Sequence, residues 1–401
     1  MIDLFYFIYY FSEMSNQNYK MVATTITGLE DVLAEELKRL GAQNVKIFNR
    51  AVEFFGDLGF MYKVNLNIRT AIRILKPIYE FNASNEEQLY QKIYAIKWEK
   101  YFGVNNTLSI HATGKSDIFN HSMYTALKTK DAIVDSFRSL YGKRPNIDLV
   151  NPDIKININV RNTKFIVSLD SSGPSLHKRG YKVASVEAPI NEVLAAGLIL
   201  LSDWNQVSNF YDPMCGSGTF LIEAALIANN IPANIFRKRF GFETWKNFDL
   251  DLWQKIRDIS LEKEKDFYGI ISGSDNFQKS LRSSRSNINN ALMRDQIKVS
   301  FKDFFDSSTR PNTHVIFNPP YGERIPISLD NFYKKIGDTL KHNYKGCSVW
   351  IISSDIENLK MIGLKPTKKI KIFNGKLECR YLKFDIYEGS KKLKKTGSIS
   401  S

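Results

Sequence analysis

Two short segments, DPMCGSGT (212–219) and NPPY (318–321), carry the residue types best suited to chemistry in this chain. Each follows a short apolar run, NFY in the first case and VIF in the second. Prolines cannot donate hydrogen bonds to a sheet, so the proline pair marks the end of a strand. Ligands of open parallel sheets bind beyond the carboxyl ends of the strands, and both segments are expected at such an edge.

The first segment predicts a strand, a tight turn and a helix. Asp212 ends the strand, and Gly216 and Gly218 allow the backbone to turn sharply and approach a ligand. The helix that follows directs free N–H groups at that ligand. No GKS or GKT follows and GxGxxG is not matched, which excludes a P-loop and the usual dinucleotide motif. The residues predicted to bind a cofactor here are Asp212, Cys215, Gly216, Ser217, Gly218 and Thr219.

Two further strand ends carry acids. Asp275 is expected to accept the two hydroxyl groups of a ribose, with a solvated loop residue as the alternative. Asp303 is a candidate acceptor for an adenine amino group, and Asp306 competes with it for that role. Cys215 has no readable histidine partner, so we interpret it as a small turn residue rather than a nucleophile.

The elements that position these residues alternate between strand and helix from about residue 181 onward, which predicts an α/β domain with a doubly wound parallel sheet. The front half differs. From Tyr19 it reads strand, helix, strand, strand, helix, strand, with Gly41 as a helix stop, and IKININVRNTKFIVSLD predicts a later hairpin. The Gly- and Ser-rich stretch 171–181 between the halves is the expected domain junction.

Composition bounds the function. The chain has 401 residues, enough for two or three domains, and a formal net charge of +14 that favours nucleic acid as a partner. Its three cysteines and five histidines show neither disulfide nor metal-site spacing, so no metal is expected. The opening MIDLFYFIYYFSEM fits neither a signal peptide nor a membrane span, and we expect a cytoplasmic protein without membrane contact.

The paired motifs DPMCGSGT and NPPYGER resemble the class I methyltransferases that use S-adenosylmethionine. More narrowly, the chain is similar to the bacterial 23S rRNA guanine-2-amino methyltransferases with a THUMP domain. TGLEDVLAEELKRLG, HKRGY, APINEVLAAGLI and NGKLECRYLKF extend the likeness from about Lys20 to Tyr387. The chain departs from the family at Asn276, where related enzymes often have an acid.

The resemblance implies methylation of an exocyclic amine, whose lone pair is delocalised into the base. Two hydrogen-bond acceptors in the plane of the amine would accept its protons and aim its nitrogen at the methyl group. The Asn318 side-chain oxygen and the Pro319 carbonyl can be these acceptors. Pro319 and Pro320 stiffen the corner in advance. Tyr321 offers a face for an extruded base. Glu323 and Arg324 could contact the substrate or only cap the loop.

The resemblance also implies a domain order. We expect an N-terminal extension (1–18), a ferredoxin-like α+β domain (19–84), a THUMP domain (85–170), a Rossmann-like methyltransferase domain (171–388) and a disordered basic tail (389–401). THUMP domains are associated with RNA, and RNA surfaces need backbone contacts from cations. The candidates are Lys128, Lys130, Arg138, Lys143 and Arg144, with His177, Lys178 and Arg179 in the junction. For each one, a solvated surface residue is the alternative.

The leading interpretation is therefore a guanine-N2 methyltransferase acting on 23S rRNA or a large-subunit precursor. One alternative is adenine-N6 methylation of nucleic acid, against which the THUMP-like half argues. A nicotinamide-dependent oxidoreductase is disfavoured because GxGxxG is missing. A non-catalytic RNA-binding protein with a methyltransferase-like fold is the fourth possibility, and the intact Asp212, Gly216, Gly218 and Asn318 argue against it.

Overall fold

The computed structural model describes residues 18–116, 119, 121–185, 189–320 and 329–387. The chain divides into two compact units. The first takes in the chain up to Gly180 together with Asn230–Glu264, and the second takes in Tyr181–Asn229 and the chain from Lys265. The chain therefore passes between the units three times, after Gly180, Asn229 and Glu264.

The first unit is built on one eight-stranded sheet with the order β2-β3-β1-β4-β8-β7-β5-β6. Its strands are β1 (Tyr19–Thr24), β2 (Gln43–Phe48), β3 (Ala51–Gly56), β4 (Arg73–Asn82), β5 (Thr107–Lys115), β6 (Asn146–Ile147), β7 (Ile154–Arg161) and β8 (Lys164–Asp170). Strand β4 is long enough to pair with β1 at its start, Leu75 facing Val22, and with β8 to its end, Asn82 facing Lys164. The sheet thus runs on through the expected boundary at residues 84/85.

The helices of this unit are α2 (Glu30–Leu40), α3 (Leu58–Asn67), α4 (Glu86–Tyr94), α5 (Ser122–Tyr141) and α8 (Leu250–Leu261), with 3-10 turns at Trp98–Lys100 and Gly241–Thr244. The order β1-α2-β2-β3-α3-β4 confirms the order predicted from the sequence. Helix α2 has acids in its first turn and Lys38 and Arg39 in its last, which suits the helix dipole. It ends at Gly41, whose φ of 108° confirms the predicted stop.

The segment 230–264 supplies part of the core of this first unit. The ring of Phe242 stacks on Tyr62 with centroids 4.4 Å apart, and Trp253 meets the same tyrosine edge-on. Buried Asn234 donates from its side-chain amide to the carbonyl of Asn65 at 2.9 Å. By packing, therefore, these residues belong with the N-terminal half although they lie within the expected methyltransferase range.

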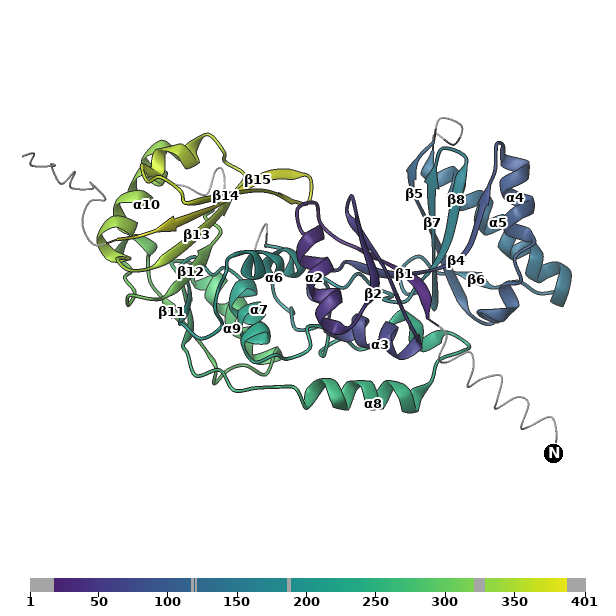
Figure 1. Ribbon diagram of the computed structural model, residues 1–401, viewed down its shortest axis with the longest axis horizontal. Helices are drawn as coiled ribbons and strands as arrows, with labels where there is room; N and C mark the ends of the chain where they lie inside the picture. Colours follow the sequence, from purple (N-terminus) through teal and green to yellow (C-terminus); the bar gives the residue numbers. More distant parts are fainter. Residues whose placement is uncertain (1–17, 117–118, 120, 186–188, 321–328, 388–401) are drawn as a thin grey trace, which may run out of the picture. The chain divides into compact units, whose positions relative to one another are not determined.

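The second unit contains a seven-stranded sheet with the order β11-β10-β9-β12-β13-β15-β14 (Figure 1). Its strands are β9 (Phe210–Asp212), β10 (Ile271–Asp275), β11 (Ile297–Phe301), β12 (His314–Phe317), β13 (Ser348–Ser353), β14 (Lys368–Asn374) and β15 (Leu377–Asp385). Strands β9 to β13 run parallel, and β15 pairs antiparallel with both β13 and β14. This confirms the predicted parallel sheet, and a hairpin of β14 and β15 completes it at one side.

The helices of the second unit are α6 (Glu192–Leu201), α7 (Thr219–Ala228), α9 (Gln278–Asn290) and α10 (Leu329–Asn343), with 3-10 turns at Phe304–Asp306 and Asn358–Ile362. From β9 the chain passes through α7 to β10 and then through α9 to β11, moving toward one side of the sheet. From β12 it passes through α10 to β13, moving toward the other side. Because such crossovers are right-handed, these two sets of helices cover opposite faces of the sheet. No helix in the described part of the chain is both long and apolar enough to span a bilayer.

Candidate active site

Strand β9 lies where the strand order of the second sheet reverses, with β10 on one side and β12 on the other. Asp212 at its end faces Gly273 of β10, so Asp275 lies two residues further along. On the other side Tyr211 faces Val315, so Asn318 lies two residues beyond the position level with Asp212. The fold thus brings these three predicted residues to one edge of the sheet, at the point where open α/β sheets bind ligands.

The turn after β9 has the geometry that its glycines predicted. Gly216 and Gly218 adopt positive φ values of 53° and 80°, and a side chain at Gly218 would meet Ser284 at 2.8 Å. Asp212 Oδ1 accepts the N–H of Met214 at 3.0 Å, which fixes the start of the turn. Helix α7 then begins at Thr219 with all of its side chains buried. The N-terminus of a core helix therefore opens at the end of the central strand.

Asp275 joins this turn to the neighbouring strand. Its Oδ2 accepts the N–H of Gly216 and its Oδ1 accepts the N–H of Phe277, each at 2.9 Å. The carboxylate therefore has a structural task at the predicted cofactor site. Its contact with ribose hydroxyls stays a prediction. The lone pairs of the carboxylate that accept no backbone N–H would make that contact.

Asp212 and Asp275 lie close together at the buried carboxyl ends of β9 and β10. Burial raises the pKa of Asp212 well above its ordinary value, and the charge of Asp275 adds to the effect. Burial likewise raises the pKa of Asp275, partly offset by the N–H groups that it accepts. Carboxylates held this way are costly to ionise without a positive partner. A positive charge bound beside them would offset that cost.

The remaining predicted cofactor residues are placed as follows. Cys215 is buried, and desolvation raises the pKa of its thiol well above the ordinary value, in keeping with a turn residue and not a thiolate nucleophile. Ser217 and Thr219 are also buried. Asp303 accepts the N–H of Phe305 and the side-chain amide of Asn276, each at 2.8 Å. It caps the turn after β11, and its adenine contact stays a prediction.

At the end of β12 the structure describes the first three residues of the NPPY motif. Asn318 and Pro320 are half-buried, and Pro319 is buried. Their position directly after a fully buried strand holds the corner in place. Tyr321, Glu323 and Arg324 lie outside the described residues.

Two residues that support this site were not predicted from the sequence. Gly273 leaves room for the turn, because a side chain there would meet Leu221 at 2.6 Å and Cys215 at 3.0 Å. Asn287 of α9 is buried and donates to the carbonyl of Ser217 at 2.9 Å, while its side-chain oxygen accepts from Val183 and Ala184. A glycine inside a strand was the available signal for the first. An asparagine in a helix gives no such signal.

The predicted RNA-binding residues lie in the first unit. On α5, Lys128 lies over the ring of Tyr90, Lys130 pairs with Asp131 at 2.6 Å, and Arg138 pairs with Asp135 at 2.7 Å. Lys143, Arg144 and Lys178 are exposed. His177 is half-buried, and its Nδ1 lies 2.8 Å from the hydroxyl of Ser175. Contact with RNA stays a prediction for these residues.

Arg179 lies in the interior of the first unit. Its side chain is 0% exposed, and its guanidinium donates to the carbonyl of Leu176 at 3.1 Å and to Asn234 Oδ1 at 3.2 Å. It also donates to the carbonyl of Arg69. The prediction that Arg179 contacts RNA is wrong, because this cation is used to satisfy buried oxygens that join the junction to segment 230–264.

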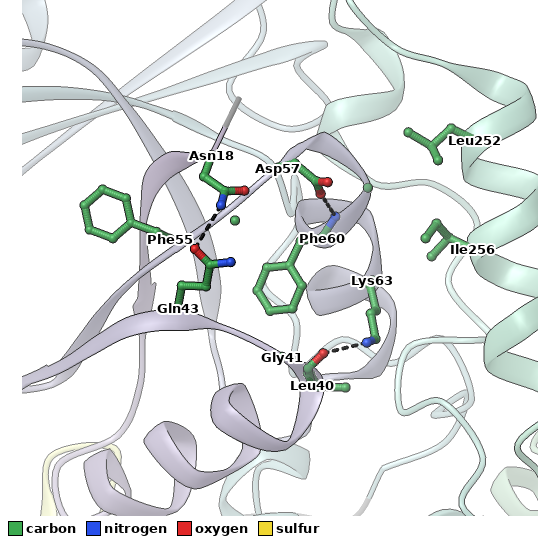
Figure 2. A pocket seen from close by; sticks show the side chains of 12 residues that line it. Asn18, Leu40, Gly41, Gln43, Phe55, Asp57, Phe60, Lys63, Leu252 and Ile256 are labelled. Atoms are coloured by element: carbon green, nitrogen blue, oxygen red, sulfur yellow. Dashed lines mark hydrogen bonds between the residues drawn. The ribbon is translucent and has the colours of Figure 1, made fainter. Parts of the chain in front are cut away.

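A cavity of about 400 Å³ lies in the first unit, lined by residues from the end of α2, from β2 and β3, and from α3 and α8 (Figure 2). Its polar groups bond to one another: Asn18 donates to Gln43 at 2.9 Å, and Lys63 donates to the carbonyl of Leu40 at 2.5 Å. These polar groups therefore already have partners within the protein. Among the described residues no group of three His, Cys, Asp or Glu side chains has an arrangement suited to a metal ion.

The chain matches three known family models in order. Residues 20–75 match the RlmL ferredoxin-like domain, 83–170 the THUMP domain, and 179–383 the RMKL-like methyltransferase domain. A Synechocystis protein named "Putative RNA methyltransferase slr0064" is 38% identical over 91% of this chain and 96% of its own length. The solved structure "SMU.472, a putative methyltransferase complexed with SAH" is 33% identical, with a TM-score of 0.82 over 93% of this chain and 100% of that one.

The ribosomal RNA large subunit methyltransferase K/L of Syntrophotalea carbinolica is 35% identical over 92% of this chain. The match covers 54% of that enzyme. The chain thus spans about half the length of the K/L relatives it matches.

Proposed function

Because the chain belongs to the RMKL-like methyltransferase family, for which S-adenosylmethionine is the methyl donor, we propose that it methylates the exocyclic 2-amino group of a guanosine in 23S ribosomal RNA. The observation that carries this proposal is the meeting of Asp212, Asp275 and Asn318 at the reversal point of the sheet. The names of the K/L relatives and the matched THUMP domain support RNA as the substrate.

The residues at the turn after β9 fit the cofactor. The positive φ values of Gly216 and Gly218 open the backbone where a ligand must approach closely, and α7 offers its N-terminus to a carboxylate. The raised pKa values of Asp212 and Asp275 suit a ligand with positive charges. When bound, S-adenosylmethionine supplies a methyl group on a positively charged sulfur.

The corner after β12 has the task of presenting the amine. In the proposal, the Asn318 side-chain oxygen and the Pro319 carbonyl accept hydrogen bonds from the two N–H groups of the guanine amine. This orientation aims the nitrogen lone pair and removes the cost of ordering the acceptors during the reaction. The buried strand β12 and the two prolines keep the corner rigid. Tyr321 would stack on the base once it leaves its helix.

A methyl-transfer assay tests the proposal. It uses radiolabelled S-adenosylmethionine as the donor and 23S rRNA from cells lacking this gene as the acceptor. We expect label in guanosine methylated on the 2-amino group. Label in adenosine would instead favour the adenine-N6 alternative, and no label in RNA would refute the proposed substrate.

The Asn318→Ala variant tests the assigned role within that assay. It should lose transfer by two orders of magnitude or more, about what one preorganised hydrogen-bond partner contributes. Its affinity for S-adenosylmethionine and RNA should be unchanged. Asn318→Asp keeps an acceptor oxygen and should retain more activity than the alanine variant. Unchanged transfer in Asn318→Ala would remove this residue from the mechanism.

A further inference from the structure

Strands β5, β7 and β8 of the first unit have two chemically different faces. On one face, Ile154, Ile156 and Ile158 of β7 are buried in the core shared with α4 and α5. Figure 1 shows these two helices beside the strands. Successive residues of a strand point to opposite sides, so Lys155, Asn159 and Arg161 lie on the other face. Of these, Arg161 is exposed and the other two are half-buried.

The pairing of β5 with β7 extends this second face across two strands. Ser109 faces Lys155, His111 faces Asn157, and Thr113 faces Asn159. The Asn159 amide donates to the Thr113 hydroxyl at 3.3 Å, which places both side chains on the same side. We call the following residues the polar sheet face: Ser109, His111, Thr113, Lys155, Asn159 and Arg161.

Cations outnumber acids around the polar sheet face. Asp170, across from Lys155 on β8, is paired with Arg73. Within the described part of the chain, no carboxylate lies at ion-pair distance from Lys155 or Arg161. Burial, together with the charges of Arg73, Lys178 and Arg237, lowers the pKa of Lys155, although the charge of Asp170 acts in the opposite direction. On α5, by contrast, Lys130 and Arg138 have acidic partners. Cations gathered without matching acids favour a polyanion.

We propose that the polar sheet face binds the sugar–phosphate backbone of a base-paired RNA stem. The inference rests on the proposed function only in taking RNA as the partner. None of the six residues is Phe, Tyr or Trp, so unpaired bases would find no such ring to stack on, whereas hydroxyl and amide groups suit ribose hydroxyls. Lys155 and Arg161 are six residues apart on one strand, roughly 20 Å, and can reach phosphates on both sides of a groove.

The test uses the full chain with a matched pair of charge changes. The double variant K155Q/R161Q removes two cations from the polar sheet face, and K38Q/K360Q removes two exposed cations that have acidic partners, Glu35 and Glu357. Binding of a labelled RNA hairpin with a continuous stem is measured over a range of salt concentrations. We expect K155Q/R161Q to lose roughly tenfold in affinity at low salt, and its slope of log affinity against log salt to fall by about 2. K38Q/K360Q should stay close to the wild type.

The outcomes separate this inference from the proposed function. Unchanged affinity and slope in K155Q/R161Q, or an equal loss in K38Q/K360Q, would overturn the inference. Tighter binding of an unpaired oligouridylate of equal length would overturn the choice of paired RNA. Stem binding that depends on Lys155 and Arg161 without methyl transfer to 23S rRNA would support the inference and refute the proposed function. Thermal unfolding of each variant checks that the fold is retained.

Discussion

The backbone N–H of Gly216 donates to Asp275 Oδ2 at 2.9 Å and so fastens the turn after β9 to the end of β10. The bond joins two residues that lie 59 positions apart in the chain. Each contributes to the predicted cofactor site, so the stability of the turn and the binding of the cofactor should change together.

Gly273 lies against the turn after β9, and the first prediction is that this position has no room for a side chain. In Gly273→Ala the new methyl group would lie 2.6 Å from Leu221 and 3.1 Å from the carbonyl of Asp212. We expect the free energy of unfolding to fall by roughly 1–3 kcal/mol and the affinity for S-adenosylmethionine to fall with it. Urea denaturation and calorimetry measure the two effects. Gly103→Ala, where the nearest atom lies 3.8 Å away, is the control and should change neither.

The second prediction concerns pH. The folded pKa values of Asp212 and Asp275 are raised above the ordinary 3.8, so from about that value upward the folded protein without ligand holds protons that the unfolded chain has lost. Its free energy of unfolding therefore falls as pH rises through the raised pKa values. A cationic ligand favours the ionised acids, so the affinity for S-adenosylmethionine should rise over the same range.

S-adenosylhomocysteine lacks the sulfonium charge and is the control ligand for this effect. Its affinity should depend less on pH than that of S-adenosylmethionine. Titration calorimetry at several pH values measures both. Parallel pH profiles for the two ligands would show that the acids do not respond to the charge on sulfur.

A third prediction follows from the burial of Arg179. Arg179→Met removes a guanidinium that donates to Leu176, Asn234 and Arg69 and leaves those oxygens buried. The free energy of unfolding should fall by about 3 kcal/mol. Lys178→Met, at the exposed position just before Arg179, should change stability by less than about 0.5 kcal/mol. Equal stabilities of the two variants in urea would contradict the structural role of Arg179.

The fourth prediction concerns the core of the first unit. A fragment of residues 18–180 lacks Phe242 and Trp253, which pack on Tyr62. We expect it to bind hydrophobic dyes and to unfold without a sharp transition. The same fragment joined by a flexible linker to residues 230–264 should unfold cooperatively. A cooperative transition at the same midpoint in both fragments would show that the segment is dispensable for the core.

Local sequence signals predicted the parts of the site that depend on backbone chemistry. The glycines of the turn and the prolines of NPPY restrict or release φ at their own positions, so their effect is readable without a structure. The alternating residues of β7 and β8 similarly predicted the hairpin that the structure contains. These features depend on neighbours in sequence.

Features that depend on distant partners were not predictable in this way. Arg179 belongs to a basic, glycine-containing stretch that is typical of an exposed linker, yet Asn234 and the carbonyls of Ile68, Arg69 and Leu176 enclose it. Likewise, nothing in the sequence of residues 230–264 indicates that their aromatic side chains complete a core begun near Tyr62. In both cases long-range packing decides the environment.

The threefold passage of the chain between the two units also sets an order of events during translation. A ribosome releases residues from the amino end, so Phe242 and Trp253 emerge only after α6, β9 and α7 of the second unit have already appeared. The nascent N-terminal half must therefore wait with an open core while the first strand of the catalytic sheet is made. We expect the two units to mature together late in synthesis, and not as independent modules released one after the other.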